Sequence, residues 1–221
     1  MAGDRYPVLL DLTGRLVIVL GGTRAAERSA AAMAAHGADV VVITPDVSPS
    51  LLELEASGAL TVEPRGYVRG DLAGAFLVVS AADSPEIAAA IRDEAKTRGT
   101  LLNVLADADA SDFTVPSVVR RGKLQIAVST AGVAPAATRR VRREIAATYG
   151  PEWGVYVALL GAVRRRAIER FGVGDAALKP LFDSIDASDL LDRIKAGEDL
   201  SPDDVLEQHA AAMEPPAVDP A

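Results

Sequence analysis

Residues 15–29, RLVIVLGGTRAAERS, join a short run of branched apolar residues to a helical pattern through two adjacent glycines. The apolar run ends at Leu20, Gly21 and Gly22 follow at once, and small residues recur at helical spacing from Arg24. A buried strand that turns sharply into a helix is the opening of a βαβ unit. This stretch therefore predicts a parallel sheet covered by helices.

The same turn is typical of domains that bind dinucleotides. Glycines let the backbone approach a pyrophosphate, and the helix N-terminus offers unpaired N–H groups and a partial positive charge. Of the usual pattern G-x-G-x-x-G/A, Gly21 and Ala26 fill the outer places, and Thr23 replaces the middle glycine. A plain tight turn that closes a buried strand is the alternative interpretation, and the motif alone leaves it open.

Apolar runs and helical patterns alternate through the first half of the chain. The runs lie at residues 16–20, 40–44, 60–63, 76–80 and 101–105, and the helical patterns at residues 24–36, 48–57 and 85–98. Helices of about 10–14 residues between short strands predict right-handed crossovers in a parallel sheet. Gly37 is the expected cap of the first helix. We therefore predict an α/β fold with a Rossmann-like domain at residues 1–113.

The pattern changes after residue 113. Two apolar runs, at residues 113–119 and 124–129, predict strands, and Pro135 is expected to start a helix that ends near residue 149. Further helical patterns occupy residues 152–171, 176–185, 187–195 and 201–213. These predict a small segment at 114–149, a helical domain at 150–213 and a disordered tail at 214–221.

Composition excludes several classes of protein. No apolar run approaches the roughly 18 residues that span a bilayer, so no membrane association is expected. The formal net charge of −8 argues against nucleic acid as a partner. The chain has no cysteine, which excludes disulfides and thiolate metal sites, and its two histidines form no metal-ligand pattern. These features predict a cytoplasmic protein without a metal centre.

Seven blocks of sequence occur in an order that identifies a family. They are PVLLDL at residues 7–12, LGGTRAAERS at 20–29, VITPD at 42–46, SAAD at 80–83, NV at 103–104, DFTVPS at 112–117 and AVSTAGVAP at 127–135. With this order and spacing, residues 5–170 resemble the precorrin-2 dehydrogenase/sirohydrochlorin ferrochelatase family, the N-terminal part of siroheme synthase.

The resemblance implies NAD-dependent oxidation of precorrin-2, a tetrapyrrole, to sirohydrochlorin in siroheme biosynthesis, with ferrous iron as a further substrate in many members. It also implies a homodimer formed through residues 114–149, where the apolar strands need a partner to cover their edges. The expected cofactor contacts are Gly21, Gly22, Thr23, Arg24, Ala25, Thr44, Pro45, Asp46, Ala81 and Asn103. NAD is favoured over NADP because no cation directly follows the second strand.

The expected substrate contacts are Ser129, Thr130, Gly132, Arg139 and Arg143. Arginine binds carboxylates bidentately and stays charged, and precorrin-2 carries many carboxylates. The arginines between residues 139 and 143 cannot all share one helix face, and a solvated helix surface is the alternative for them.

The chain departs from the family pattern at three places. Thr23 stands where the family has glycine, and Ala131 stands where it often has glycine. Ala106 stands where the family has a functional aspartate, three residues after the asparagine of NV. Asp107 is therefore our candidate for the catalytic acid or base, with Asp109 following it. A surface loop aspartate, or a member that has lost this group, is the alternative.

Two other functions are alternatives for a chain with this βαβ pattern. Short-chain dehydrogenases need Tyr-x-x-x-Lys, but the four tyrosines are followed four residues later by Leu10, Asp71, Trp153 and Leu160. A nucleotide-sensing regulatory domain without catalysis would account for the βαβ pattern and for the missing aspartate. It would not account for the segment STAGVAP followed by an arginine-rich helix.

Overall fold

The computed structural model describes residues 5–105 and 107–213. The chain forms two compact units. The first holds the described residues up to Val115 together with Ala131–Val133, and the second holds Pro116–Thr130 and the described residues from Ala134 onward. Two positions discussed from the sequence lie outside the described residues. They are Ala106, where the family pattern has an aspartate, and residues 214–221, which are expected to be a disordered tail.

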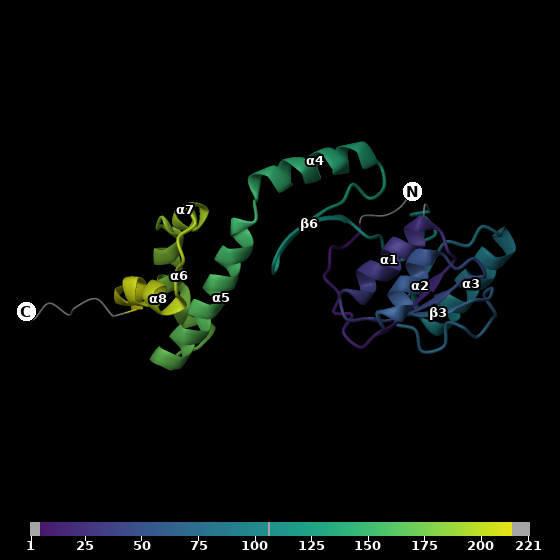
Figure 1. The fold of residues 1–221 in the computed structure, drawn as a ribbon, viewed down its shortest axis with the longest axis horizontal. Helices are drawn as coiled ribbons and strands as arrows, with labels where there is room; N and C mark the ends of the chain where they lie inside the picture. Colours follow the sequence, from purple (N-terminus) through teal and green to yellow (C-terminus); the bar gives the residue numbers. More distant parts are fainter. Residues whose placement is uncertain (1–4, 106, 214–221) are drawn as a thin grey trace, which may run out of the picture. The chain divides into compact units, whose positions relative to one another are not determined.

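The first unit is built on a parallel sheet (Figure 1). Its strands are β1 (Leu16–Leu20), β2 (Asp39–Ile43), β3 (Thr61–Glu63), β4 (Leu77–Ser80) and β5 (Leu101–Val104). They lie in the order β3-β2-β1-β4-β5, and each neighbouring pair is parallel. The predicted Rossmann-like α/β fold is confirmed. The chain reverses its direction of travel across the sheet between β1 and β4, which fixes where a ligand crevice forms.

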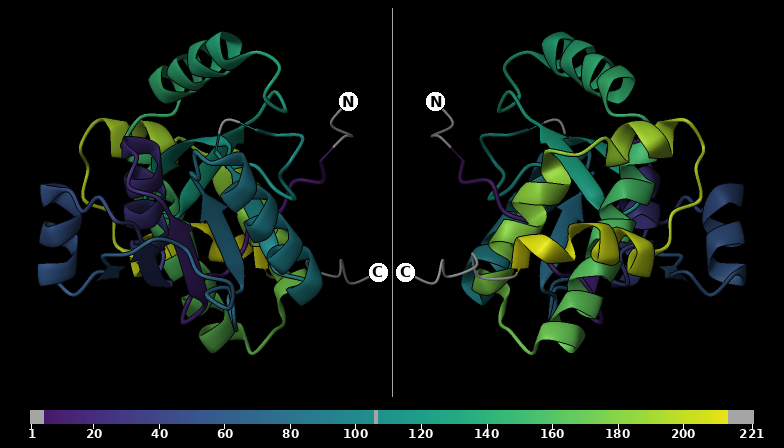
Figure 2. Two further views of the ribbon diagram at one scale, coloured as in Figure 1. Left: turned by 90° about the vertical axis from the view of Figure 1, so that its right-hand side faces the viewer. Right: turned by 90° about the vertical axis from the view of Figure 1, so that its left-hand side faces the viewer.

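Helices cover both faces of this sheet (Figure 2). They are α1 (Arg24–Ala34), α2 (Pro49–Ala56) and α3 (Pro85–Arg98). Val17 and Val19 of β1 pack on the face that α1 and α2 cover, whereas Ile18 and Leu20 pack on the face that α3 covers. The strand is apolar on both faces because helices shield each of them from water.

Side-chain caps define where the helices begin. The hydroxyls of Thr23, Ser48 and Ser84 accept hydrogen bonds from backbone N–H groups in the first turns of α1, α2 and α3. Each such cap stabilises its helix by about 1 kcal/mol. The predicted cap at Gly37 is wrong by two residues, since Ala35 caps α1. Gly37 has a φ of +80° and reverses the chain toward β2.

A buried carboxylate holds the long connection between β3 and β4 against α3. Glu94 is 2% exposed and accepts hydrogen bonds from Tyr67 Oη at 2.5 Å, Gly70 N at 2.9 Å, Leu72 N at 3.3 Å and Arg98 Nε at 2.7 Å. Burial raises the pKa of Glu94, but these hydrogen bonds outweigh it and lower the pKa to about 2.

The second unit combines a hairpin with helices. Its elements are β6 (Ser117–Arg121), β7 (Leu124–Val128), α4 (Pro135–Thr148), α5 (Glu152–Phe171), α6 (Lys179–Asp186), α7 (Leu190–Lys195), α8 (Pro202–His209) and the 3₁₀ turns Asp175–Leu178 and Ala210–Met213. The antiparallel hairpin turns at Gly122, where φ is +55°. Val163 of α5, Leu181 of α6 and Leu206 of α8 centre the helical core.

Several predicted elements differ in this region. The helix expected at 187–195 begins at Leu190, and the one expected at 201–213 is α8 followed by a 3₁₀ turn. The strand expected from residue 113 begins at Ser117, because Phe113 packs against the core of the first unit and Pro116 cannot donate to a ladder. The helix expected at 176–185 is a 3₁₀ turn followed by α6, which starts at Lys179 and carries Pro180 in its first turn. Within the described residues, no helix is both long enough and apolar enough to cross a membrane.

Candidate functional site

The candidate site lies at the carboxyl edge of the parallel sheet, where β1 and β4 diverge. Gly21 follows β1, and its N–H donates to Ile43 O at 2.9 Å. Ala81 follows β4, and its N–H donates to Leu20 O at 2.8 Å. Thr44 follows β2 at the same edge, because all three strands run in one direction. The structure therefore brings these predicted cofactor contacts side by side at the switch in strand order, where open α/β sheets bind ligands.

The residues around the turn leave little room for a side chain at either glycine. Gly21 has a φ of +100°, and a Cβ there would lie 3.1 Å from Ala81 O. A Cβ on Gly22 would lie 2.4 Å from Asp46 O and 2.8 Å from Thr44 Oγ1. The turn thus packs tightly between the ends of β2 and β4. Thr23 is exposed and caps α1, so a side chain is accommodated at the place where the usual motif has its second glycine.

The turn presents unpaired donors. Thr23 Oγ1 accepts from Ala26 N–H at 3.3 Å, whereas the N–H groups of Arg24 and Ala25 have no acceptor in the described parts of the chain. Such N–H groups, with the positive end of the helix dipole, suit an anion. The first turn of α1 therefore fits a pyrophosphate.

The end of β2 differs from the usual pattern, in which an acidic residue binds the ribose hydroxyls. Thr44 is 1% exposed, and its hydroxyl is hydrogen-bonded to the backbone N–H and C=O of Asp46 at 3.2 and 3.3 Å. Pro45 and Asp46 are exposed. Thr44 thus shapes the loop from within, and Asp46 is the residue of this group that a ribose could reach.

The loop after β5 carries Asp107 at the same edge of the sheet. Asp107 is exposed, and its Oδ1 accepts from Ala110 N–H at 3.0 Å, while Oδ2 has no partner among the described residues. Two strand spacings, about 10 Å, separate β5 from β1 and its glycine turn. Asn103 of β5 is buried, and its amide donates to Phe113 O at 2.9 Å, so this predicted cofactor contact also fastens the far end of the loop.

A residue that the sequence analysis missed holds this loop in place. The guanidinium of Arg5 donates to Ala108 O at 2.5 Å, Ser111 O at 3.0 Å and Asp112 O at 2.9 Å. The carboxylate of Asp112 in turn accepts from Leu102 N–H at 2.9 Å. Nothing in the sequence near Arg5 signals these bonds, because its partners lie more than 100 residues away.

The segment Ala131–Val133 belongs to the same unit as this loop. Gly132 has a φ of +84°, and a Cβ there would lie 3.7 Å from the Cβ of Ala108. The predicted substrate contact Gly132 is thus close to the loop of Asp107. Ala131 has a φ of +50°, a left-handed conformation that costs a non-glycine residue roughly 1 kcal/mol and that glycine adopts freely.

The other predicted substrate contacts belong to the second unit. Ser129 follows β7. Thr130 Oγ1 accepts from Ala134 N–H at 3.2 Å and lies 3.0 Å from Thr138 Oγ1, so it orders the start of α4. Arg139 and Arg143 are exposed on one face of α4, and neither makes an ion pair with a described residue. Among the described residues, no group of acidic or histidine side chains is arranged to hold a metal ion.

Comparisons with known proteins agree with this architecture. A family model described as "Putative NAD(P)-binding" matches residues 8–117, and one described as "Sirohaem biosynthesis protein central" matches residues 121–148. The siroheme synthase of Azotobacter vinelandii is 31% identical over 217 residues, 97% of this chain and 46% of that protein. The siroheme synthase of Chromobacterium violaceum is 30% identical over 94% of this chain and 44% of that protein. The chain therefore spans less than half the length of these relatives.

Two comparisons cover most of the matched protein. The precorrin-2 dehydrogenase of Priestia megaterium is 30% identical over 155 residues, 70% of this chain and 76% of that protein. The solved structure of SirC, precorrin-2 dehydrogenase, superposes with a TM-score of 0.75 at 26% identity and covers 94% of this chain and all of that one. The resemblance inferred from the sequence blocks is confirmed. The chain belongs to the precorrin-2 dehydrogenase family, to which siroheme synthases are also related over less than half of their length.

Proposed function

We propose that this chain binds NAD at the carboxyl edge of its parallel sheet and oxidises precorrin-2 to sirohydrochlorin in siroheme biosynthesis. The observation that carries the proposal is the Gly21-Gly22 turn at the switch in strand order, in a member of this family. The unpaired N–H groups of Arg24 and Ala25 would hold the pyrophosphate, and Asp46 the adenosine ribose. When bound, the cofactor supplies the two-electron acceptor for a hydride.

Precorrin-2 must lose one hydride and one proton to become sirohydrochlorin. We assign the proton to Asp107, whose Oδ2 has no partner among the described residues. The N–H of Ala110 on Oδ1 and the bonds from Arg5 to the same loop keep this carboxylate in place. Asp107 then releases the proton to solvent. The products of precorrin-2 and NAD are therefore sirohydrochlorin, NADH and one proton.

The substrate's carboxylates call for cations that are free to bind them. Arg139 and Arg143 lie one helical turn apart on α4, whereas their neighbour Arg140 is paired with Glu144 at 2.9 Å. Two guanidinium groups at this spacing suit two carboxylate arms of one macrocycle. We therefore assign them, with Ser129, Thr130 and Gly132, to substrate binding.

Anaerobic turnover of precorrin-2 with NAD tests this function. We expect sirohydrochlorin and NADH to appear in equal amounts by absorbance. A nucleotide-sensing regulatory domain would instead bind NADH and leave precorrin-2 unchanged.

We extend the proposal to ferrous iron as a further substrate, because metal insertion also requires a base that removes protons from the macrocycle. Sirohydrochlorin that persists when Fe²⁺ is added would contradict the iron step and leave the dehydrogenase assignment intact.

We also propose that the chain is a homodimer, and that it works in the cytoplasm. The two-stranded sheet β6–β7 leaves both edges to be covered, and no described residue of α4 is buried. Light scattering at micromolar concentration should therefore give twice the chain mass of 23.0 kDa. A mass that stays at 23.0 kDa as the concentration is raised would refute the dimer.

A further inference from the structure

A groove of about 260 Å³ runs between α1 and α2. Both helices begin at the carboxyl edge of the sheet, because each follows a parallel strand. Arg24 is the first residue of α1 and Ser50 the second of α2, so the groove opens at this edge, next to the proposed cofactor turn. Its lining residues are Arg24, Glu27, Arg28, Ala31, Ser50 and Leu54.

The two arginines of this groove are placed unfavourably for an isolated helix. They lie one turn apart on the same face of α1, and like charges at this spacing repel each other. They also lie near the positive end of the helix dipole. Neither guanidinium group makes a hydrogen bond or ion pair with a described residue, and Glu27 is the single acidic residue in the lining. A bound anion would relieve both repulsions.

The second helix adds donors to the same groove. Ser48 caps α2 by accepting from Leu51 N–H at 3.2 Å. The N–H and the hydroxyl of Ser50 have no partner in the part of the chain that the structure describes. Two arginines and a serine from the N-terminal halves of two helices thus line one groove, and they supply the kinds of donor that bind a phosphate dianion.

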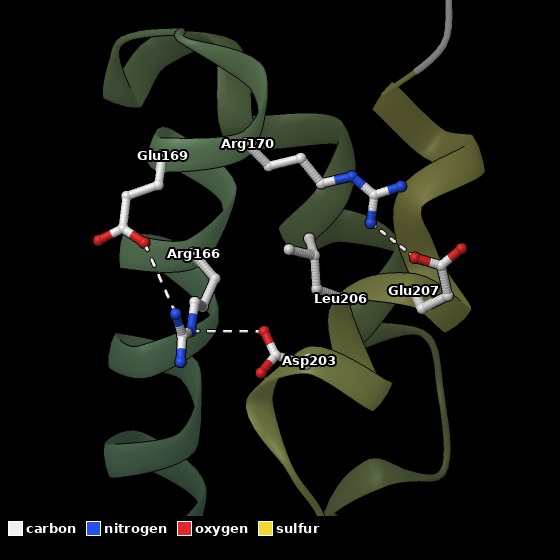
Figure 3. Close-up of a pocket in the computed structure, with 6 residues that line it drawn as sticks. All are labelled: Arg166, Glu169, Arg170, Asp203, Leu206 and Glu207. Atoms are coloured by element: carbon white, nitrogen blue, oxygen red, sulfur yellow. Dashed lines mark hydrogen bonds and ion pairs between the residues drawn. The ribbon is translucent and has the colours of Figure 1, made fainter.

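A second groove shows how arginines on this protein behave without a ligand. It lies between α5 and α8 and holds about 350 Å³ (Figure 3). There Arg166 lies 3.4 Å from Asp203 and 3.8 Å from Glu169, and Arg170 lies 2.6 Å from Glu207. Each of these arginines is neutralised by carboxylates. In the α1–α2 groove Glu27 is the one carboxylate in the lining, and neither arginine forms an ion pair with it, so this groove is the better anion site.

We infer that the α1–α2 groove binds a phosphate on the 2′-position of the cofactor's adenosine ribose, so that the chain accepts NADP(H) as well as NAD(H). Arginines near the end of the second strand accommodate that phosphate in dinucleotide-binding folds, whereas an acidic residue there favours the free hydroxyl. Here the buried Thr44 occupies the acidic place. Asp46, which we assign to the ribose hydroxyls of NAD, lies outside the lining of the groove that would take the phosphate. The predicted preference for NAD is based on the residues that follow β2, whereas the two arginines lie on α1. The inference rests on the proposed cofactor site.

Fluorescence titrations with NADH and NADPH test this. The parent should bind both, and Arg28→Ala should weaken NADPH by about 10–100-fold, the effect of losing charge-assisted hydrogen bonds. NADH binding should change by less than about threefold, since its free hydroxyl needs no cation. Arg92→Ala removes an exposed arginine of α3 that makes no ion pair with a described residue, and it should leave both affinities unchanged. Thermal melts of each variant check that it is folded.

The alternative outcomes separate the two proposals. A parent that binds NADH but not NADPH would overturn the phosphate site and leave the proposed function standing. Equal losses for both nucleotides in Arg28→Ala would mean that Arg28 contacts a part that the two cofactors share, which also overturns it. A parent that binds neither nucleotide would overturn the cofactor site and this inference together. In Gly21→Val, where φ is +100°, both nucleotides should lose affinity if the turn is the cofactor site.

Discussion

Replacing Asp107 with alanine should lower the rate of precorrin-2 oxidation by about two to four orders of magnitude, the usual contribution of a general acid or base. The carboxylate is exposed at the carboxyl edge of the sheet, and its Oδ2 is available to take a proton. Binding of NADH should not change, because the glycine turn lies two strands away. Anaerobic assays that follow sirohydrochlorin absorbance measure the rate, and fluorescence titration measures cofactor binding.

Two further variants distinguish chemistry from loop structure. Asp107→Asn keeps an oxygen that can accept from Ala110 N–H, so the loop is preserved and the proton acceptor alone is lost. It should be as inactive as the alanine variant. Asp109→Ala removes an exposed carboxylate two residues further on and should keep most of the activity. Parental activity in Asp107→Asn would rule out the catalytic assignment. Ala106→Asp, which restores the residue of the resembling family, should then raise the rate.

The sheet and its helices could be predicted because their signals are local. The run at residues 16–20 is an apolar strand bounded by a charge and a glycine, and β1 has those bounds. Helix α3 begins with the cap Ser84 and Pro85 and ends before Gly99, which has a φ of +69°, so its limits match the prediction at both ends. Caps, prolines and glycines act on the backbone within a few residues, so their effects can be predicted from the sequence alone.

The loops around the site could not be predicted in this way, because distant parts of the chain hold them. Gly22 was attributed to a close phosphate approach, but its Cβ position is filled by Asp46 O, 24 residues along the chain. Arg5 reaches Ala108 across 103 residues. The arginines of the α1–α2 groove become a site only once α2 is packed beside α1. The residue types were visible in each case, and the packing that gives them a role was not.

Replacing Glu94 is expected to lower the free energy of unfolding more than the other substitutions considered for stability. Its carboxylate is buried, so Glu94→Ala would leave the hydroxyl of Tyr67 and the N–H groups of Gly70 and Leu72 without an acceptor. Loss of such a buried charged partner costs about 3–5 kcal/mol. The neighbouring variant Asp93→Asn breaks the exposed ion pair with Arg69 and should cost less than about 1 kcal/mol. Hydrogen exchange of amides in β4 and β5 measures the first unit alone, whereas Trp153 fluorescence reports the second.

The pKa of Glu94 gives this prediction a pH dependence with a definite sign. The folded value of about 2 lies below the value of about 4.3 for an unfolded glutamate. The contribution is therefore complete above about pH 5 and disappears as the pH falls from about 4.3 to about 2. A shift of this size corresponds to about 3 kcal/mol at neutral pH, in line with the cost of removing the carboxylate. The stability difference between the parent and Glu94→Gln should shrink as the pH falls below about 4. A difference that is the same at pH 3 and pH 7 would mean that the charge of Glu94 does not hold the β3–β4 connection to α3.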